Sequence, residues 1–161
     1  MPEIIVIAHN IRSTYNVGSI FRTCDGFGVK KLILSGYTPY PSVLKDSRLP
    51  HIVSKLTDQI KKTALGAEKT VAFEYQDKPN LELLKTAGFT VVGLEQDTRS
   101  ISLKDYQPPQ KIALLLGEEV NGIESDLRDQ CDALVEIPMH GQKESFNVAV
   151  ATGIVLYSLS V

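Results

Sequence analysis

Six short apolar segments recur along the chain, and their composition predicts buried β-strands. They are rich in Val, Ile and Leu and do not alternate apolar with polar residues, which is typical of strands covered on both faces of a sheet. We expect strands at residues 4–8, 31–34, 70–73, 90–94, 112–116 and 133–137.

The intervals between these segments carry the three-to-four-residue apolar spacing of amphipathic helices. The clearest helix opens at Asn16, a residue type that often caps helices, and ends at a stop signal at Gly28. We expect weaker helices at 56–64, 80–86 and 125–131, and a closing helix at 145–159, where a Val-rich composition leaves a strand possible. Alternating strands and helices predict an α/β fold, a single domain with a largely parallel sheet flanked by helices.

The composition fits one soluble domain with its own core, because 43% of the 161 residues are hydrophobic. No apolar run is long enough to cross a membrane, and residues 1–3 lack the positive flank of a secretion signal, so we expect a cytoplasmic protein. The two cysteines, Cys24 and Cys131, are too few for a disulfide framework, and the three histidines form no zinc motif. We therefore expect no metal site.

Charge is distributed unevenly along the chain. The net charge is −2, but residues 1–80 hold 11 basic and 7 acidic side chains, whereas residues 81–161 hold 6 and 12. Between residues 30 and 62, seven basic residues face only Asp46 and Asp58, an excess that could attract a polyanion. A solvated Lys-rich surface explains the same pattern.

Two loops after predicted strands could bring backbone groups close to a ligand, because ligand sites of parallel sheets gather beyond the carboxyl ends of strands. Residues 117–122 contain two glycines but no phosphate-loop signature, and residues 26–28 do not form a dinucleotide fingerprint. Residues 138–147 could hold an adenine or an amino-acid moiety through backbone hydrogen bonds. Ser145 and Asn147 in that loop also look like ordinary helix caps, which the local pattern favours.

Three motifs in this order resemble those of the SpoU/TrmH family of RNA 2′-O-ribose methyltransferases, within the SPOUT superfamily. They are Asn16-x-Gly18-x-x-x-Arg22, Gly117-x-Glu119-x-x-Gly122 and Ile137-Pro138-Met139-x-Gly141-x-x-x-Ser145-Phe146-Asn147-Val148. The resemblance covers almost the whole chain and implies one methyltransferase domain over residues 1–161, with no separate RNA-binding extension. It also implies a deep trefoil knot in the C-terminal third, an exception to the usual rules of chain connection.

The resemblance implies that S-adenosyl-L-methionine methylates a ribose 2′-hydroxyl in structured RNA, with tRNA favoured over rRNA. It implies a homodimer whose active site lies at the subunit interface. The expected cofactor contacts are Leu94, Gly117, Ile137, Met139, Ser145 and Phe146. The expected catalytic residues are Asn16, Arg22, Glu119, Ser145 and Asn147. The expected RNA-binding residues are Arg12, Arg22, Lys45, Arg48 and Lys55.

By the same resemblance, Arg22 would grip the phosphate beside the target ribose and polarise or deprotonate the hydroxyl, although an arginine is almost always protonated. Two positions depart from the family pattern, Phe146 in place of the more common Leu and Glu118 in place of Asn or Ser. Other functions remain open: a non-catalytic RNA-binding or cofactor-sensing knotted paralogue, a base methyltransferase of the wider superfamily, and a purely structural protein.

Overall fold

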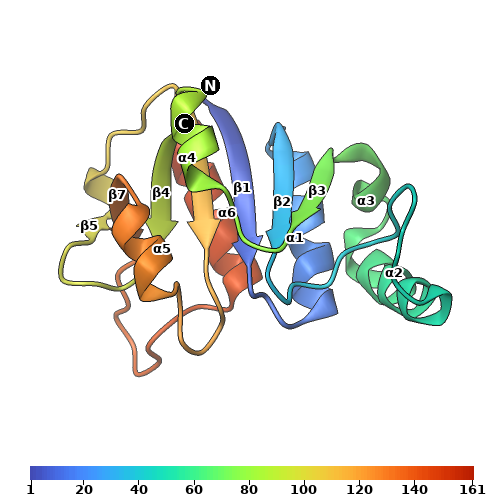
Figure 1. Ribbon diagram of the computed structural model, residues 1–161. Helices are drawn as coiled ribbons and strands as arrows, with labels where there is room; N and C mark the ends of the chain where they lie inside the picture. The colour runs from blue at the N-terminus through green and yellow to red at the C-terminus, as the bar shows by residue number, and fades with distance from the viewer.

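Seven parallel strands form one sheet at the centre of the molecule, as the computed structural model shows for all 161 residues (Figure 1). The strand order is β3-β2-β1-β6-β4-β7-β5, and every neighbouring pair is parallel. The strands are β1 (Glu3–His9), β2 (Lys31–Ser35), β3 (Phe73–Gln76), β4 (Thr90–Leu94), β5 (Ile101–Ser102), β6 (Lys111–Leu116) and β7 (Ala133–Glu136). The predicted parallel α/β sheet is confirmed.

Helices cover both faces of this sheet. One face carries α1 (Thr14–Gly26), α2 (Pro50–Ala64), α3 (Ala67–Thr70) and α6 (Val148–Ser160). The other carries α4 (Leu81–Thr86) and α5 (Ser125–Gln130). A short 3-10 helix at Leu103–Asp105 packs near α6, and its Leu103 belongs to the core on the α1 side. No helix is long and apolar enough to cross a membrane.

The central strand β1 shows how the two cores are built. Successive side chains of a strand point to opposite faces, so Ile4 and Val6 pack toward α1 and α6 while Ile5 and Ile7 pack toward α4 and α5. The core on the α1 side holds 24 buried residues and the opposite core holds 10, so the α1 and α6 layer contributes more of the apolar burial.

Two of the predicted elements were misplaced. The strand expected at 70–73 is wrong, because Thr70 ends α3 and the strand runs over Phe73–Gln76. This strand lies at the edge of the sheet and pairs only with β2, so its side chains are half-buried and include polar residues that break the apolar pattern. The helix expected at 56–64 begins earlier, at Pro50, where proline fits the first turn.

Three short elements, α3, β5 and the 3-10 helix, were not predicted, because two to four residues show no periodicity. The trefoil knot implied by the resemblance stays a prediction.

Candidate active site

A cavity of about 290 Å³ opens at the carboxyl ends of three neighbouring strands, β6, β4 and β7. Its walls come from the segments that follow these strands, residues 94–96, 116–122 and 136–148, and from the start of α6. The chain segments lie far apart in sequence, and the parallel sheet brings them together because the carboxyl ends of its strands share one edge.

All six residues expected to contact a cofactor line this cavity. Leu94 ends β4 and Gly117 follows β6, while the other four follow β7: Ile137, Met139, Ser145 and Phe146. Both positions that depart from the family pattern, Glu118 and Phe146, also belong to the wall. Their contact with a cofactor stays a prediction, but the fold gathers them around one space.

The cavity wall carries a strong negative charge that the motif analysis missed. Five carboxylates belong to it and no lysine or arginine does: Glu95, Glu118, Glu119, Glu136 and Glu144. The signal in the sequence was the acidic balance of residues 81–161. A wall of this kind favours a cationic ligand.

The second motif folds into a tight turn that forms one side of the cavity. The backbones of Glu118 and Gly122 exchange hydrogen bonds of 3.0 and 2.9 Å, and Gly122 adopts a positive φ of 70°. A side chain on Gly117 would overlap the backbone of Gly122 and Ile123. Glu95 Oε2 accepts a hydrogen bond from the Ile123 N–H at 2.7 Å, which fastens this turn to the end of β4.

The first and third motifs meet through two asparagines. Asn147 caps α6, because its Oδ1 accepts hydrogen bonds from the N–H groups of Ala149 and Val150 at 2.9 and 3.3 Å. Its Nδ2 donates to Asn16 Oδ1 at 3.1 Å. Asn147 is therefore both a helix cap and a link to α1. Ser145 is not a cap; it lines the cavity.

Asn16 is not the cap of α1, which corrects the sequence prediction. The helix begins at Thr14, and the cap is Ser13, whose Oγ accepts a hydrogen bond from the Asn16 backbone N–H at 3.2 Å. Asn16 thus lies in the first turn of the helix, and its side chain is free to accept from Asn147. The sequence allowed either residue to cap, since serine and asparagine cap helices about equally well.

Arg22 and Arg12 are set apart from the other arginines. Both are exposed, and their guanidinium groups have no hydrogen-bond or ion-pair partner, whereas Arg48, Arg99 and Arg128 are all paired with aspartates. Glu119 lines the cavity, and its Oε2 accepts a hydrogen bond from the Arg12 backbone N–H at 3.4 Å. Arg22 makes no hydrogen bond to the other predicted catalytic residues within one chain.

Arg48 holds a loop rather than facing solvent. Its guanidinium donates to both carboxylate oxygens of Asp46, at 3.0 and 2.7 Å, and to the carbonyls of Tyr40 and Pro41, at 2.9 and 3.0 Å. These bonds use four of its five N–H groups, and the hydrogen bond from Arg48 holds the pKa of Asp46 well below its usual range. Arg48 is therefore poorly placed to bind RNA. In the sequence, the aspartate two residues earlier, Asp46, was the feature that could have indicated this internal pairing.

Lys45 and Lys55, the other predicted RNA-binding residues outside the motifs, are exposed and unpaired. Their contact with RNA stays a prediction.

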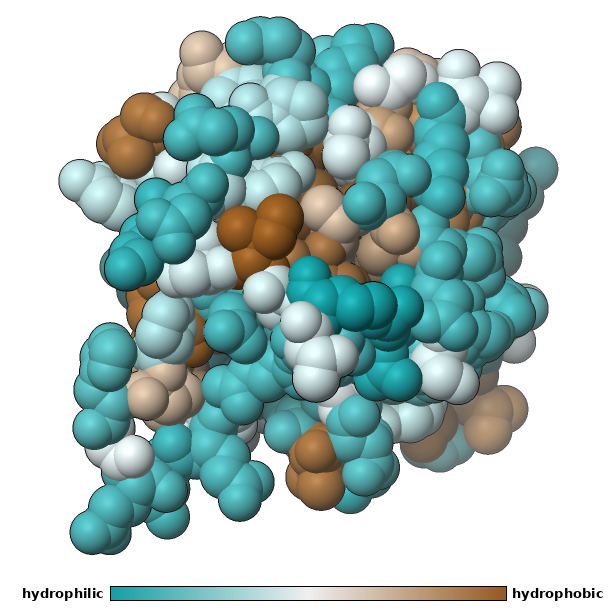
Figure 2. Space-filling model, turned by 90° about the vertical axis from the view of Figure 1, so that its left-hand side faces the viewer, coloured by the Kyte–Doolittle hydropathy of each residue, from teal (hydrophilic) through white to brown (hydrophobic).

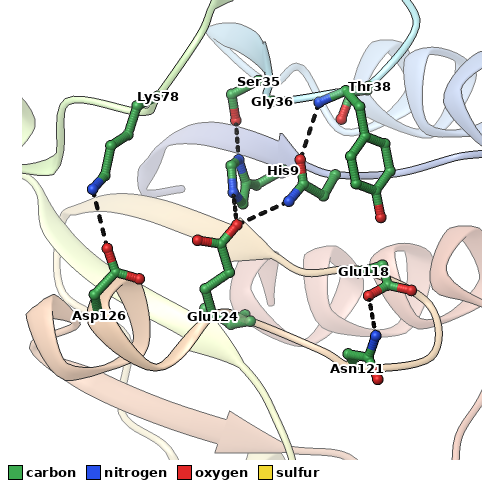
Figure 3. A network of polar contacts seen from close by, with 12 residues as sticks. His9, Ser35, Gly36, Thr38, Lys78, Glu118, Asn121, Glu124 and Asp126 are labelled. Atoms are coloured by element: carbon green, nitrogen blue, oxygen red, sulfur yellow. Dashed lines mark hydrogen bonds and ion pairs between the residues drawn. The ribbon is translucent and has the colours of Figure 1, made fainter.

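A network of polar contacts joins the ends of β1 and β2 to the segment before α5 (Figure 3). The buried His9 ring contacts Ser35 Oγ through Nδ1 and Glu124 Oε1 through Nε2, both at 2.9 Å. Asn10 Nδ2 donates to the same Glu124 oxygen at 2.9 Å. No sequence pattern indicated this network, because each of these bonds joins residues that are 26 or more positions apart and that belong to no motif.

The fold and the cavity define an α/β protein whose ligand site lies beyond the carboxyl ends of three parallel strands. The model of the SpoU rRNA Methylase family matches residues 3–157, and the chain belongs to this family.

Similar proteins agree with this assignment. A "tRNA (guanosine(18)-2′-O)-methyltransferase" of Aquifex aeolicus is 30% identical over 157 residues, which cover 96% of this chain and 67% of that protein. The "23S rRNA (guanosine-2′-O-)-methyltransferase RlmB" of Neisseria meningitidis is 31% identical over 96% of this chain and 57% of its own length. The chain thus spans only part of the length of these relatives.

Solved structures share the fold. The A. aeolicus TrmH/SpoU tRNA modifying enzyme has a TM-score of 0.79 and 28% identity, over 99% of this chain and 75% of that one. The SpoU methyltransferase AviRb from Streptomyces viridochromogenes, in complex with the cofactor AdoMet, has a TM-score of 0.78 and 25% identity, over 98% and 57%. The fold of this chain is therefore that of SPOUT methyltransferases.

Proposed function

We propose that this protein transfers the methyl group of S-adenosyl-L-methionine to a ribose 2′-hydroxyl of structured RNA. The observation that carries the proposal is the cavity, which gathers all six expected cofactor contacts in a chain of the SpoU family. The names of the relatives support ribose methylation, and that of the Aquifex relative favours tRNA over rRNA. AviRb, a structural neighbour, binds the same cofactor.

The cavity suits this cofactor in size and charge. Its volume of about 290 Å³ is near the lower end of small-molecule sites. Apolar side chains, including Leu94, Ile137 and Phe146, offer a surface for the adenine, and the five carboxylates complement a sulfonium and an ammonium group. The bound cofactor supplies a methyl group that its positive sulfur already activates.

The residues of the chain would align the ribose and manage its proton. The 2′-oxygen forms a bond to the methyl carbon while the carbon–sulfur bond breaks, and the hydroxyl proton passes to solvent water. Arg22, whose guanidinium has no partner, would hold the adjacent phosphate with a forked pair of hydrogen bonds. Asn16, held by Asn147, would orient the ribose, and Glu119 and Ser145 would fix the side facing the cofactor.

We infer that the working unit is a homodimer that shares the site between subunits. Helix α6 packs beside α1 and leaves Val150 and Tyr157, seven residues apart on one helical face, 53% and 62% exposed. Tyr15 on α1 is 50% exposed. The edge at β5 and β7, in contrast, shows a mostly hydrophilic surface with small separate apolar patches (Figure 2). The apolar face of α6 is therefore the better candidate for a subunit contact.

Mixed dimers test the shared site. Tyr157→Asp should shift the protein from dimer to monomer in analytical ultracentrifugation. Mixing an inactive Arg22→Ala chain with an inactive Ser145→Trp chain, whose cavity is filled, should restore part of the activity. Activity that never returns in confirmed mixed dimers would contradict the shared site.

Methyl transfer to RNA is the direct test of function. The purified protein is incubated with labelled S-adenosyl-L-methionine and unmodified total RNA, and the tRNA and rRNA fractions are digested to nucleosides. We expect label in a 2′-O-methylnucleoside, and its loss in Arg22→Ala. Lys69→Ala, which removes an exposed unpaired cation on α3, is the matched control and should keep full activity.

The outcomes separate the competing functions. Label in an N-methylated base would favour a base methyltransferase. Cofactor binding without any transfer, over a broad sample of RNA, would favour the non-catalytic paralogue.

A protein that acts on tRNA in translation would work in the cytoplasm, which cell fractionation tests.

A further inference from the structure

An exposed tyrosine and an unpaired arginine face each other beside the candidate active site. The Arg12 guanidinium carbon lies 6.0 Å from the centre of the Tyr37 ring, and the ring is part of a residue that is 52% exposed. The chain contains a closed pair for comparison, since Arg48 lies only 3.5 Å from the centre of the Tyr40 ring. The distance from the guanidinium carbon to the ring centre is thus about 2.5 Å longer in the Arg12 and Tyr37 pair than in the Arg48 and Tyr40 pair.

Arg12 and Tyr37 have fixed backbones next to the cavity wall. The Arg12 N–H donates to Glu119, a residue of the wall, at 3.4 Å. The Tyr37 N–H donates to Asn10 Oδ1 at 3.0 Å, and Asn10 is bonded in turn to Glu124. Figure 3 shows this network between the ends of β1 and β2 and the segment before α5. The backbone positions are thus set, while both side chains reach into solvent.

The gap suits a flat aromatic ligand. A base with the Tyr37 ring on one side and the guanidinium on the other needs about 7 Å between the two groups, twice the usual carbon–carbon contact of about 3.5 Å. The distance from the guanidinium carbon to the ring centre is 6.0 Å. The Arg12 guanidinium makes no hydrogen bond or ion pair and is exposed, so it can move away from the Tyr37 ring to admit a base. Unpaired RNA bases stack in this way on aromatic rings and on arginine planes.

We propose that Tyr37 and Arg12 form a stacking platform for an unpaired base of the RNA substrate, close to the ribose that is methylated. The inference rests on the proposed function and adds a contact that the family motifs do not assign. Stacking tolerates any base, because every base has a π face. The platform therefore selects an unpaired nucleotide over a paired one rather than a particular base.

Fluorescence tests the stacking directly, because the chain has no tryptophan. A Tyr37→Trp variant carries a single reporter whose emission a stacked base quenches. Leu83→Trp is the matched control, since Leu83 is 62% exposed on α4, which leads into the opposite end of the sheet. Each variant is titrated with unmodified bulk tRNA, a single-stranded RNA oligomer and a fully paired RNA duplex.

We expect tRNA and the single strand to quench the Tyr37→Trp variant and the duplex to leave it unchanged. The Leu83→Trp variant should not respond to any of the three. Equal emission of the Tyr37→Trp variant with and without tRNA would overturn the proposal, as would equal quenching of both variants.

Binding and kinetics give a second readout. Tyr37→Ala should weaken tRNA binding by about tenfold or more and raise the KM for RNA, with kcat and cofactor affinity unchanged. Tyr37→Phe keeps the ring and should behave as the wild type. If the wild type binds tRNA and tRNA quenches the Tyr37→Trp variant, but the wild type transfers no methyl group, the proposed function fails and the stacking platform is still supported. If it methylates and Tyr37→Ala matches it in KM, the platform fails alone.

Discussion

The side-chain amide of Asn147 donates a hydrogen bond to the side-chain oxygen of Asn16 at 3.1 Å, across 131 residues of sequence. One residue starts α6, and the other lies in the first turn of α1. The contact joins the two helices beside the cavity and sets the distance between the first and third motifs. Its loss should therefore affect the site more than the fold.

Substitutions at Asn147 separate these two effects. Asn147→Ala removes the cap of α6 and should cost about 1 kcal/mol of folding free energy as well as activity. Asn147→Ser keeps a capping oxygen but loses the donor to Asn16, so it should fold almost as stably as the wild type and still methylate RNA more slowly. Urea unfolding and methyl transfer measure the two. A fully active Asn147→Ser protein would show that the link does not position the site.

The sequence predicted the frame of this site and left out the contacts that shape it. Buried strands such as β1 and β6 were recognisable because continuous apolar runs suit strands covered on both faces. The edge strand β3 was not, because one of its sides faces no partner strand. The cofactor-site residues came from the motifs, whereas the bonds of His9 and Glu95 depend on distant chain segments that no local pattern reveals.

Gly18 of the first motif has a packing role. It lies on α1 where α2 crosses closely, and an added Cβ would overlap Ile60 O and Thr63 Oγ1. Gly18→Ala should therefore destabilise the protein by about 1–3 kcal/mol, because the backbone of α2 cannot give way cheaply. Gly26→Ala at the end of α1 is the control, since an added Cβ there meets nothing within 4 Å. Thermal unfolding of both variants checks this, and equal melting temperatures would refute the role.

The exposed lysines and Arg48 should differ in their effect on RNA binding. Lys45→Gln and Lys55→Gln remove unpaired cations, so tRNA binding should weaken slightly and depend less steeply on salt. Arg48→Gln breaks the bonds to Asp46 and to two carbonyls, so it should mainly destabilise the loop after β2. Filter binding over a salt series and urea unfolding distinguish the two. An unchanged salt slope in Lys45→Gln and Lys55→Gln would return these lysines to an ordinary solvated surface.

Acid should weaken the loop after β4 through Asp97. The hydrogen bonds from Arg99 lower the pKa of Asp97 from 3.8 to about 2. A lowered folded pKa means that the stabilisation is complete above the unfolded value and is lost as the pH falls from about 4 toward 2. In urea unfolding, the wild type should have a larger free energy of unfolding than Asp97→Asn at neutral pH. This difference in stability should shrink below pH 4. A constant difference across that range would exclude this linkage.

The acidic cavity wall should distinguish the methyl donor from its demethylated product. Losing the methyl group converts a positive sulfonium into a neutral thioether, so only the donor gains from nearby carboxylates. Glu136 and Glu144 line the cavity, and their carboxylates make no hydrogen bond or ion pair. Replacing either with glutamine therefore removes its charge without breaking another contact. Glu136→Gln should weaken S-adenosyl-L-methionine binding by roughly threefold to tenfold and hardly change S-adenosylhomocysteine binding.

Calorimetric titration of both compounds at low and high salt checks this, with Glu82→Gln on α4 as the remote control. High salt should reduce the difference in binding affinity between donor and product in the wild type, because mobile ions screen partly exposed charges. An equal loss of affinity for donor and product in Glu136→Gln would mean that Glu136 contributes to the shape of the cavity and not to its electrostatic preference for a cation. A selective loss for the donor would mean that the wall helps to release the product after each transfer.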